Sequence, residues 1–107
     1  DGHNCCQSVV LAYSDVIGID ADRANMLAAP FGRGLSGLRE LCGCVSGMSM
    51  VAGLTGNAHI TKDLAEDFRV ENGDIVCGRL LASRKKPCRE YVACAARLLS
   101  KRIDKDE

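Results

Sequence analysis

The stretch LCGCVSGMSM, residues 41–50, governs how the helices of this chain pack against one another. Its apolar residues recur at helical spacing, but cysteine, glycine and serine stand where a core helix usually carries leucine. The small residues lie on two adjacent helical faces: Cys42, Ser46, Ser49 and Gly53 on one, Gly43 and Gly47 on the other. Small side chains permit close approach, so we expect this segment to lie against the helices that carry Cys5 and Cys88. The plainer alternative is glycine-mediated packing with no chemistry at the sulfur atoms.

The composition limits the classes of protein to which the chain can belong. With 107 residues, we expect one helical, cysteine-rich domain over residues 1–107. The 14 acidic and 14 basic residues cancel, and aromatic residues are scarce, so neither bulk charge nor base stacking favours a nucleic-acid partner. No stretch approaches the roughly 18 apolar residues of a membrane-spanning helix, so we expect no membrane association. No signal peptide is visible, but the chain starts without a methionine, so that absence proves nothing.

Hydrophobic spacing and capping residues predict an all-α fold, a compact bundle of four to five helices. Asn4 is expected to cap a helix that runs to about Ile17 and ends at Gly18. Asp20 is expected to cap a helix over 21–29, stopped by Pro30. Further helices are expected at about 38–54, 60–70, 75–82 and 87–103. Thr61 or its neighbour is expected to cap the second of these and Asp74 the third, and Pro87 opens the last. The remaining segments are a glycine-rich loop at 31–37, a basic connector at 83–86 and a frayed tail at 104–107.

Seven cysteines are present: Cys5, Cys6, Cys42, Cys44, Cys77, Cys88 and Cys94. An odd number fits poorly with a fully disulfide-bonded secreted framework, and a helical chain of this length does not need disulfides to fold. We therefore expect a reducing compartment, the cytoplasm. Many cysteines in such a compartment indicate metal ligands or redox chemistry, with some serving as small core residues.

Four of the cysteines are predicted near helix starts. Cys5 follows the cap Asn4, Cys77 lies three residues beyond the expected cap Asp74, and Cys88 follows Pro87. Cys42 falls in the first turns of its own helix. Unpaired N–H groups and the helix dipole stabilise a thiolate at such positions, and basic residues around Cys88 act in the same direction. Four helix starts can converge at one end of a bundle, which suits either a metal centre or a thiol relay.

The other thiols and the two histidines have plainer interpretations. Cys94, Cys44 and Cys6 lie on apolar helical positions where cysteine usually acts as a small hydrophobic residue. The chain has no Cys-x-x-Cys pair, and the Cys42-Gly43-Cys44 pair is a weak motif. His3 precedes Cys5 by two residues and could coordinate or relay a proton, although a near-terminal histidine is more often solvated. His59 is expected to be exposed.

Three sequence elements, spread over nearly the whole chain, resemble a prokaryotic family of redox proteins named for its C_GCAxxG_C_C cysteine pattern. Members carry a Gly-x-Asn-Cys-x-Gln-x-Val element, a CGAxxG motif after a glycine-rich loop, and two later cysteines. Here these read Gly2-His3-Asn4-Cys5-Cys6-Gln7-Ser8-Val9; Cys42-Gly43-Cys44-Val45-Ser46-Gly47 after Gly32, Gly34 and Gly37; and Phe68, Gly73-Asp74-Ile75-Val76-Cys77, Leu80-Leu81, Cys88 and Val92. The resemblance implies that Cys5, Cys42, Cys77 and Cys88 are the family cysteines. One residue departs from the pattern: Cys44 stands at the motif's alanine, where it either adds a thiol or fills the same space.

Three functions remain open at this point. The first is electron transfer or redox sensing by an iron–sulfur cluster, or another metal, on Cys5, Cys42, Cys77 and Cys88, with Cys44, Cys6 and His3 as accessory residues. The second is a dithiol/disulfide protein without metal, in which one cysteine attacks and another resolves. The third is a structural zinc site or a plain helical interaction module. The sequence names neither the redox partner protein nor a substrate, does not decide whether the protein is an enzyme, and leaves a homodimer open.

Overall fold

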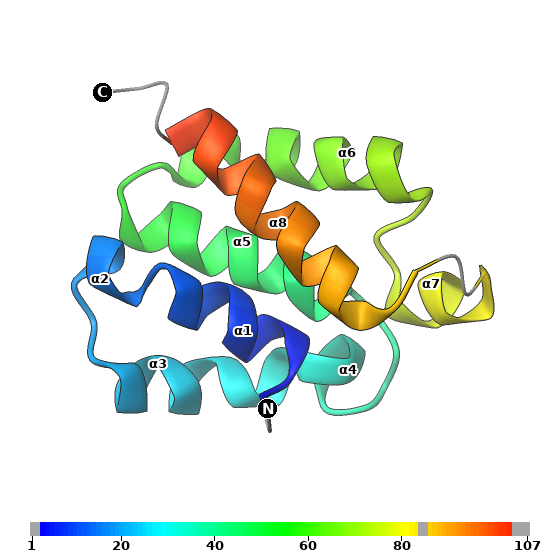
Figure 1. The fold of residues 1–107 in the computed structure, drawn as a ribbon, viewed down its shortest axis with the longest axis horizontal. Coiled ribbons are helices and arrows are strands. Elements are labelled where there is room, and N and C mark those ends of the chain that lie inside the picture. Colours follow the sequence, from blue (N-terminus) through cyan, green and yellow to red (C-terminus); the bar gives the residue numbers. More distant parts are fainter. Residues whose placement is uncertain (1–2, 84–85, 104–107) are drawn as a thin grey trace.

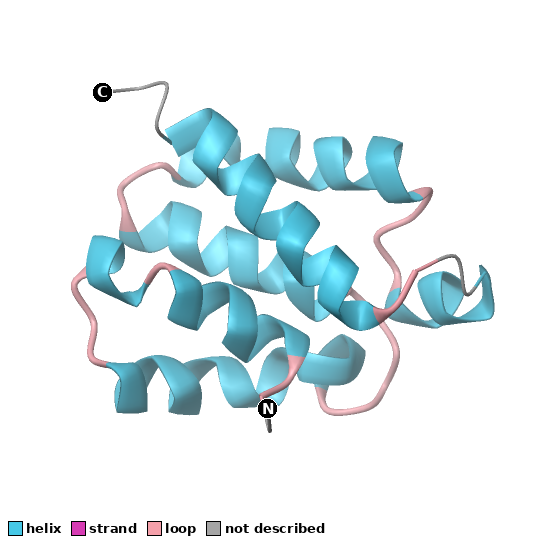
Figure 2. Ribbon diagram, viewed as in Figure 1, coloured by secondary structure: helices cyan, strands magenta, loops and turns pink. Residues whose placement is uncertain are grey.

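The computed structural model describes residues 3–83 and 86–103, and it is built from helices (Figures 1 and 2). The α-helices are α1 Cys5–Ala12, α2 Ser14–Ile17, α3 Ala21–Ala28, α4 Gly32–Leu35, α5 Gly43–Leu54, α6 Thr61–Asn72, α7 Cys77–Ser83 and α8 Cys88–Ile103, with 3-10 turns at Ala29–Phe31 and Ala58–Ile60. Within the described ranges no strand occurs, only an isolated bridge. The all-α prediction is confirmed, but four to five helices is too few. The predicted tail at 104–107 and the middle of the basic connector, 84–85, lie outside the described residues.

The first predicted helix is interrupted, which accounts for part of the difference. Asn4 caps α1 as expected, because its side chain accepts a hydrogen bond from the Gln7 N–H while the Gln7 side chain accepts one from the Asn4 N–H. The helix then breaks at Tyr13, whose hydroxyl donates to the carbonyl of Ala96 in α8. A long-range contact thus replaces one turn of the predicted helix. Gly18 ends α2 with φ of 70°, as its position predicts.

The central helix begins five residues later than predicted. Residues 38–42 are not helical, because Leu41 forms an antiparallel bridge with Val76. The Cys42 N–H donates to the Ile75 carbonyl at 2.8 Å, and the Cys77 N–H donates to the Glu40 carbonyl at 2.6 Å. These bonds fix the start of α7 against the start of α5, although the two helices are far apart in sequence.

Two predicted caps are wrong in detail. The residue before α6 is Ile60, which makes no capping hydrogen bond through its side chain, and Thr61 is the first residue of the helix. Asp74 accepts hydrogen bonds from the N–H groups of Ile75 and Val76, so it closes a turn, and α7 begins only at Cys77. The later start makes Cys77 the first residue of its helix.

The glycine-rich loop contains an unexpected element, α4, whose backbone is left-handed. Residues 33–36 all have positive φ, and three of them are not glycine: Arg33 at 55°, Leu35 at 75° and Ser36 at 51°. A left-handed residue with a side chain costs about 1–2 kcal/mol. Hydrogen bonds from Arg39 N–H to the Arg33 carbonyl and from Glu40 N–H to the Gly34 carbonyl hold this turn closed. The surrounding contacts therefore impose a conformation that the local sequence does not favour.

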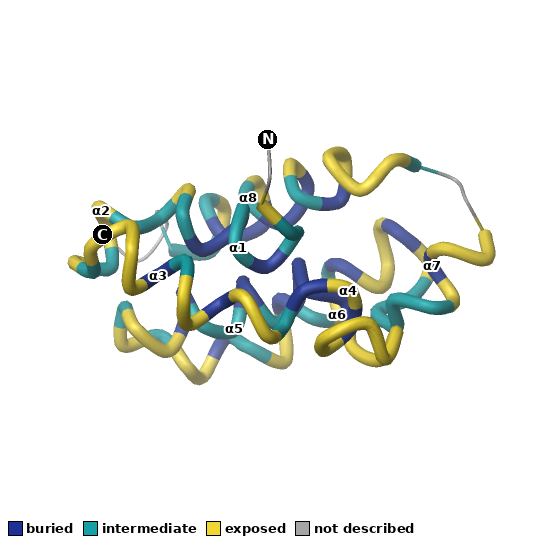
Figure 3. The backbone as a smooth tube through the Cα atoms, turned by 90° about the horizontal axis from the view of Figure 1, so that it is seen from below, coloured by how far each residue is buried: buried dark blue, intermediate teal, exposed yellow. Residues whose placement is uncertain are grey.

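The helices form two layers, with α1 and α8 covering α3, α5 and α6 (Figure 3), and buried residues face the space between the layers. The apolar core surrounds α5, which packs against α1, α6 and α8. A Cβ added at Gly47 would lie 2.9 Å from the Val9 Cβ, and one added at Gly43 would overlap the Cys5 sulfur. The expectation that this small face admits the helix carrying Cys5 is confirmed. None of the described helices has the length and apolar character needed to cross a membrane.

The contact at Gly47 leads to a stability prediction with a matched control in the same helix. Gly47→Ala should lower the free energy of unfolding by about 1–3 kcal/mol, because the new methyl group meets Val9 in a full core. Gly53→Ala meets no atom within 4 Å and should raise stability by up to about 1 kcal/mol through helix propensity. Urea unfolding followed by circular dichroism measures both. Equal effects of the two substitutions would contradict the close α1–α5 approach.

Candidate functional site

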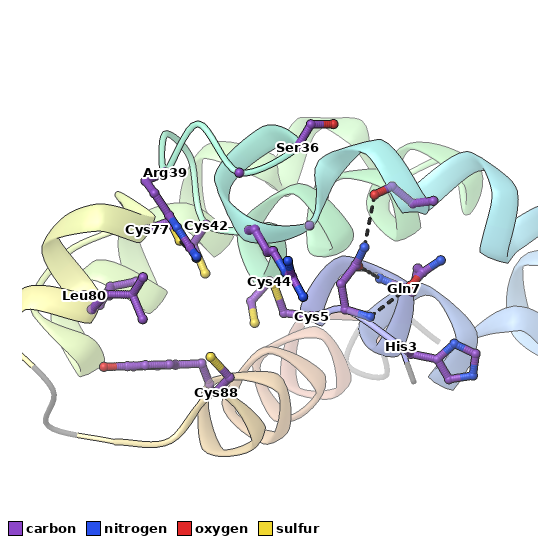
Figure 4. A pocket seen from close by; sticks show the side chains of 17 residues that line it. His3, Cys5, Gln7, Ser36, Arg39, Cys42, Cys44, Cys77, Leu80 and Cys88 are labelled. Carbon is purple, nitrogen blue, oxygen red and sulfur yellow. Dashed lines mark hydrogen bonds between the residues drawn. The ribbon is translucent and has the colours of Figure 1, made fainter. Parts of the chain in front are cut away.

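A cavity of about 700 Å³ opens where α1, α5, α7 and α8 begin (Figure 4). Five of the seven cysteines line it: Cys5, Cys42, Cys44, Cys77 and Cys88. The fold therefore brings the four family cysteines of the sequence analysis to one place, together with the accessory Cys44. His3 also lines the cavity, on its exposed rim. Whether these residues act as ligands stays a prediction.

Four of these thiols lie at helix starts, as predicted, although the caps expected for the helices of Cys42 and Cys77 differ from those observed. Cys5, Cys77 and Cys88 are the first residues of α1, α7 and α8, and Cys42 is the residue that precedes α5. The N-termini of the longer helices α5 and α8 carry unpaired N–H groups and partial positive charge. Their common orientation toward the cavity favours negative charge on sulfur atoms there.

The Gly-x-Asn-Cys-x-Gln element anchors Cys5. Asn4 donates from its side-chain amide to the Ala29 carbonyl at 3.0 Å, and Gln7 donates to the Asn25 carbonyl at 3.1 Å. A Cβ at Gly32 would overlap the Asn4 side chain, so glycine is required for this approach. The two amides of the capping box thus attach the start of α1 to α3 and to the turn after it, and Cys5 lies between them.

The Cys5 sulfur rests on Gly43, between the thiols that flank this glycine. Hydrogen bonds from the Cys42 and Cys44 thiols, and a further bond from the Arg33 N–H of the left-handed turn, lower the pKa of Cys5 to about 2 against the opposing effect of burial. For Cys42, a hydrogen bond with Cys44 lowers the pKa, but its bond to Cys5 and its burial raise it to about 12. Bonds to Cys42 and Cys5, with burial, also raise the pKa of Cys44. Within this trio Cys5 carries the negative charge.

Cys77 and Cys88 also line the cavity: Cys77 lies on the segment whose backbone is bonded to residues 40–42, and Cys88 is the first residue of α8. A guanidinium nitrogen of Arg39 lies 3.6 Å from the Cys77 sulfur, and the Arg39 carbonyl accepts from the Gly78 N–H. Cys88 is exposed, and the ring of Tyr91, one turn further along α8, lines the wall beside it. Lys86, one of the basic residues near Cys88 in the sequence, donates to the Asn72 side chain and lies over the Tyr91 ring.

Apart from the thiols, the charged residues that line the cavity in the described part of the chain are basic. Arg33 and Arg39 are among the described residues that line it, and no aspartate or glutamate is. The whole chain is neutral, so this local excess of positive charge is specific to the site. Neither arginine nor Tyr91 is predicted from the sequence motifs, which consist of cysteines, glycines and capping residues. A signal for Arg33 exists, since it lies in the glycine-rich loop that precedes Cys42 in the family motif.

The described cysteines do not form a closely packed ion site. No group of three or more histidine, cysteine, aspartate or glutamate side chains in the described ranges is arranged to hold a metal ion. A preformed tetrahedral zinc site, one of the predicted alternatives, needs four such ligands around a single point. The five thiols instead line a larger cavity of about 700 Å³.

Two cysteines lie away from the cavity. Cys6, a predicted accessory residue, is buried in a separate cluster beside Met50, and burial raises its pKa to about 12. Cys94 is buried as expected but does more than pack: its thiol donates to the Glu71 carboxylate at 2.6 Å, and Asn72 donates to its sulfur. Burial raises the pKa of Cys94, so both thiols are protonated core residues.

The described part of the chain is thus a helical domain in which five thiols and two arginines line one cavity. The family model described as "Putative redox-active protein (C_GCAxxG_C_C)" matches residues 3–102, so the chain belongs to this family. The resemblance drawn from the motifs is thereby confirmed. No curated protein and no solved structure matches the chain.

The hydrogen bonds to Cys5 predict its reactivity. Because its pKa is about 2, Cys5 is already a thiolate at acidic pH, so alkylation by iodoacetamide should proceed at a nearly constant rate from about pH 5 to 8. Removing the donors in a Cys42→Ala/Cys44→Ala double variant should raise the pKa of Cys5 and restore a rate that falls as the pH is lowered. Mass spectrometry of the N-terminal peptide, in a Cys6→Ala background, measures the rate. A tenfold loss of rate per pH unit in the parent protein would contradict the assignment of charge to Cys5.

Proposed function

We propose that this protein is a redox centre that holds an iron–sulfur cluster on Cys5, Cys42, Cys77 and Cys88 and exchanges electrons with a partner protein. The observation that carries the proposal is that these four cysteines, from four different helices, line one cavity. Cysteine thiolates alone supply the ligands of the common two-iron and four-iron clusters. When bound, the cluster would supply one-electron chemistry.

The donor set and its surroundings suit a cluster better than a single ion. A polynuclear cluster takes its ligands from the sides of a space, whereas one ion needs them around a point, and the described residues offer no group of three for an ion. Four thiolates with a cluster carry net negative charge. Arg33, Arg39 and the starts of α5 and α8 would offset that charge in a cavity that no described carboxylate lines.

A dithiol/disulfide function is the second candidate, and a separate observation favours it. The Cys5 sulfur accepts hydrogen bonds from two neighbouring thiols, so an attacking thiolate and a resolving thiol already lie in contact. This chemistry needs no metal and uses only the three thiols around Gly43. It makes no use of Cys77 or Cys88, which is why we place it second.

Reconstitution without oxygen tests the cluster. Protein reduced and incubated with ferrous iron and sulfide should bind both, with absorbance near about 400 nm from sulfur-to-iron charge transfer. Cys42→Ser and Cys88→Ser, which remove proposed ligands at the starts of α5 and α8, should each lose most of the bound iron. Cys6→Ala is the matched control, because Cys6 is adjacent to Cys5 but faces a different cluster of the core, and it should load fully.

The outcomes separate the two candidates. Iron-free, colourless protein after reconstitution would refute the cluster. If the same protein then takes up two oxidising equivalents and forms a disulfide that includes Cys5, the dithiol function stands in its place. Loss of iron binding in Cys6→Ala as large as in Cys42→Ser would show that the cavity is not the site.

A further inference from the structure

Cys44 is a fifth thiol in a cavity whose proposed cluster takes four cysteine ligands. It stands where the family motif has alanine, so it is a feature of this chain and lies outside the set of family cysteines. Its side chain is fully buried, lines the cavity and makes hydrogen bonds with both Cys5 and Cys42. A thiol that only filled the space of the motif's alanine would not need contact with two other sulfur atoms.

We propose that Cys44 is the resolving thiol of Cys5, and that low-molecular-weight disulfides bearing carboxylates convert the two into a reversible disulfide in the cofactor-free protein. In this disulfide, Cys5 is no longer available as one of the four proposed ligands. Binding of the cluster then depends on the redox state of the protein. This consequence for loading rests on the proposed cluster, whereas formation of the disulfide does not.

The backbone around each candidate partner favours Cys44 over Cys42. The Cys42 N–H is bonded to the Ile75 carbonyl, and the Cys42 carbonyl accepts from the N–H groups of Val45 and Ser46. Cys42 is therefore held on both sides, between the first turn of α5 and the segment that leads to Cys77. Cys44 lies within α5, whose face at Gly43 and Gly47 touches α1. A bond between Cys5 and Cys44 joins two helices that are already in contact and leaves the bridge to the Ile75–Cys77 segment intact.

The shape and charge of the cavity indicate the oxidant. Its volume of about 700 Å³ lies in the range of small-molecule sites, and Arg33 and Arg39 line it without any carboxylate among the described residues. An anionic small disulfide is attracted by these guanidinium groups, whereas a cationic one is repelled. Cys5 is only half-buried, so a small disulfide can reach its sulfur.

The reaction is a balanced two-step exchange. The Cys5 thiolate attacks one sulfur of the small disulfide, the S–S bond of that molecule breaks, and one thiolate leaves and takes a proton from solvent. Cys44 then loses its proton to solvent and attacks the Cys5 sulfur. The mixed disulfide breaks, the second small thiolate leaves, and the Cys5–Cys44 bond forms. The two cysteines are oxidised by two electrons, and one small disulfide is reduced to two thiols.

Peptide mapping after oxidation tests the pairing. Cofactor-free protein is incubated with glutathione disulfide, capped with an alkylating agent and digested with trypsin, which releases Cys5 in residues 1–23 and Cys44 in residues 40–62. A disulfide between these peptides should form in the parent protein, in Cys6→Ala and in Cys42→Ser, and should be absent from Cys44→Ala. Alanine is the residue of the family motif at this position, and circular dichroism confirms that the variant is folded. Cystamine, a cationic disulfide, should react at least several-fold more slowly than glutathione disulfide.

Several results would overturn the proposal. The proposal fails if the parent protein forms no disulfide-linked peptides, or if Cys44→Ala still forms them. It also fails if Cys42→Ser no longer forms them, because Cys42 would then be the partner of Cys5. Equal rates with the two small disulfides would overturn the assigned substrate class. A separate arm measures iron uptake: oxidised parent protein should load only after reduction, whereas Cys44→Ala that has not been exposed to glutathione disulfide should load as reduced parent protein does. If even reduced protein takes up no iron, the proposed cluster fails, while the peptide map still decides the role of Cys44.

Discussion

The close contact between α1 and α5 is the constraint on which the rest of the molecule depends. It exists because residues 43 and 47 have no side chain, so that the Cys5 sulfur and Val9 can lie directly on the backbone of α5. The same contact builds the core and gathers three thiols. A larger residue at position 43 would separate the helices and move Cys5 out of reach of its two hydrogen-bond donors. Structural packing and sulfur chemistry therefore use the same glycine.

The left-handed turn at residues 33–36 and the isolated bridge between Leu41 and Val76 complete the cavity. Backbone bonds between residues 40–42 and 75–77 bring Cys77 to the start of α5, and the unfavourable backbone at Arg33 aims its N–H at the Cys5 sulfur. Non-glycine residues with positive φ in the described ranges all fall between Arg33 and Arg39, on the border of the cavity. Strain concentrated at one place is typical of functional sites, where contacts elsewhere in the fold offset its cost.

Local chemistry made much of the fold predictable from sequence. Asn4, Asp20 and Gly18 act through their own side chains or backbone freedom, so capping rules found them, and with them the cysteines at helix starts. The start of α5 was mispredicted because Leu38 and Leu41 have helical spacing, while their conformation is set by a distant segment around Val76. Long-range pairing also explains why the basic residues of the cavity could not be predicted, because no local sequence pattern indicates that Arg39 lies beside Cys77. Long-range backbone pairing, not propensity, decides these positions.

The central claim is that sulfur atoms from four helix starts surround one cavity. Crystals grown without oxygen, with diffraction data collected at a wavelength where sulfur scatters anomalously, locate each sulfur atom directly. The account predicts anomalous peaks for Cys5, Cys42, Cys44, Cys77 and Cys88 around a single space, with Cys6 and Cys94 in the core away from it. Peaks for Cys77 or Cys88 on a different face from Cys5 and Cys42 would contradict it.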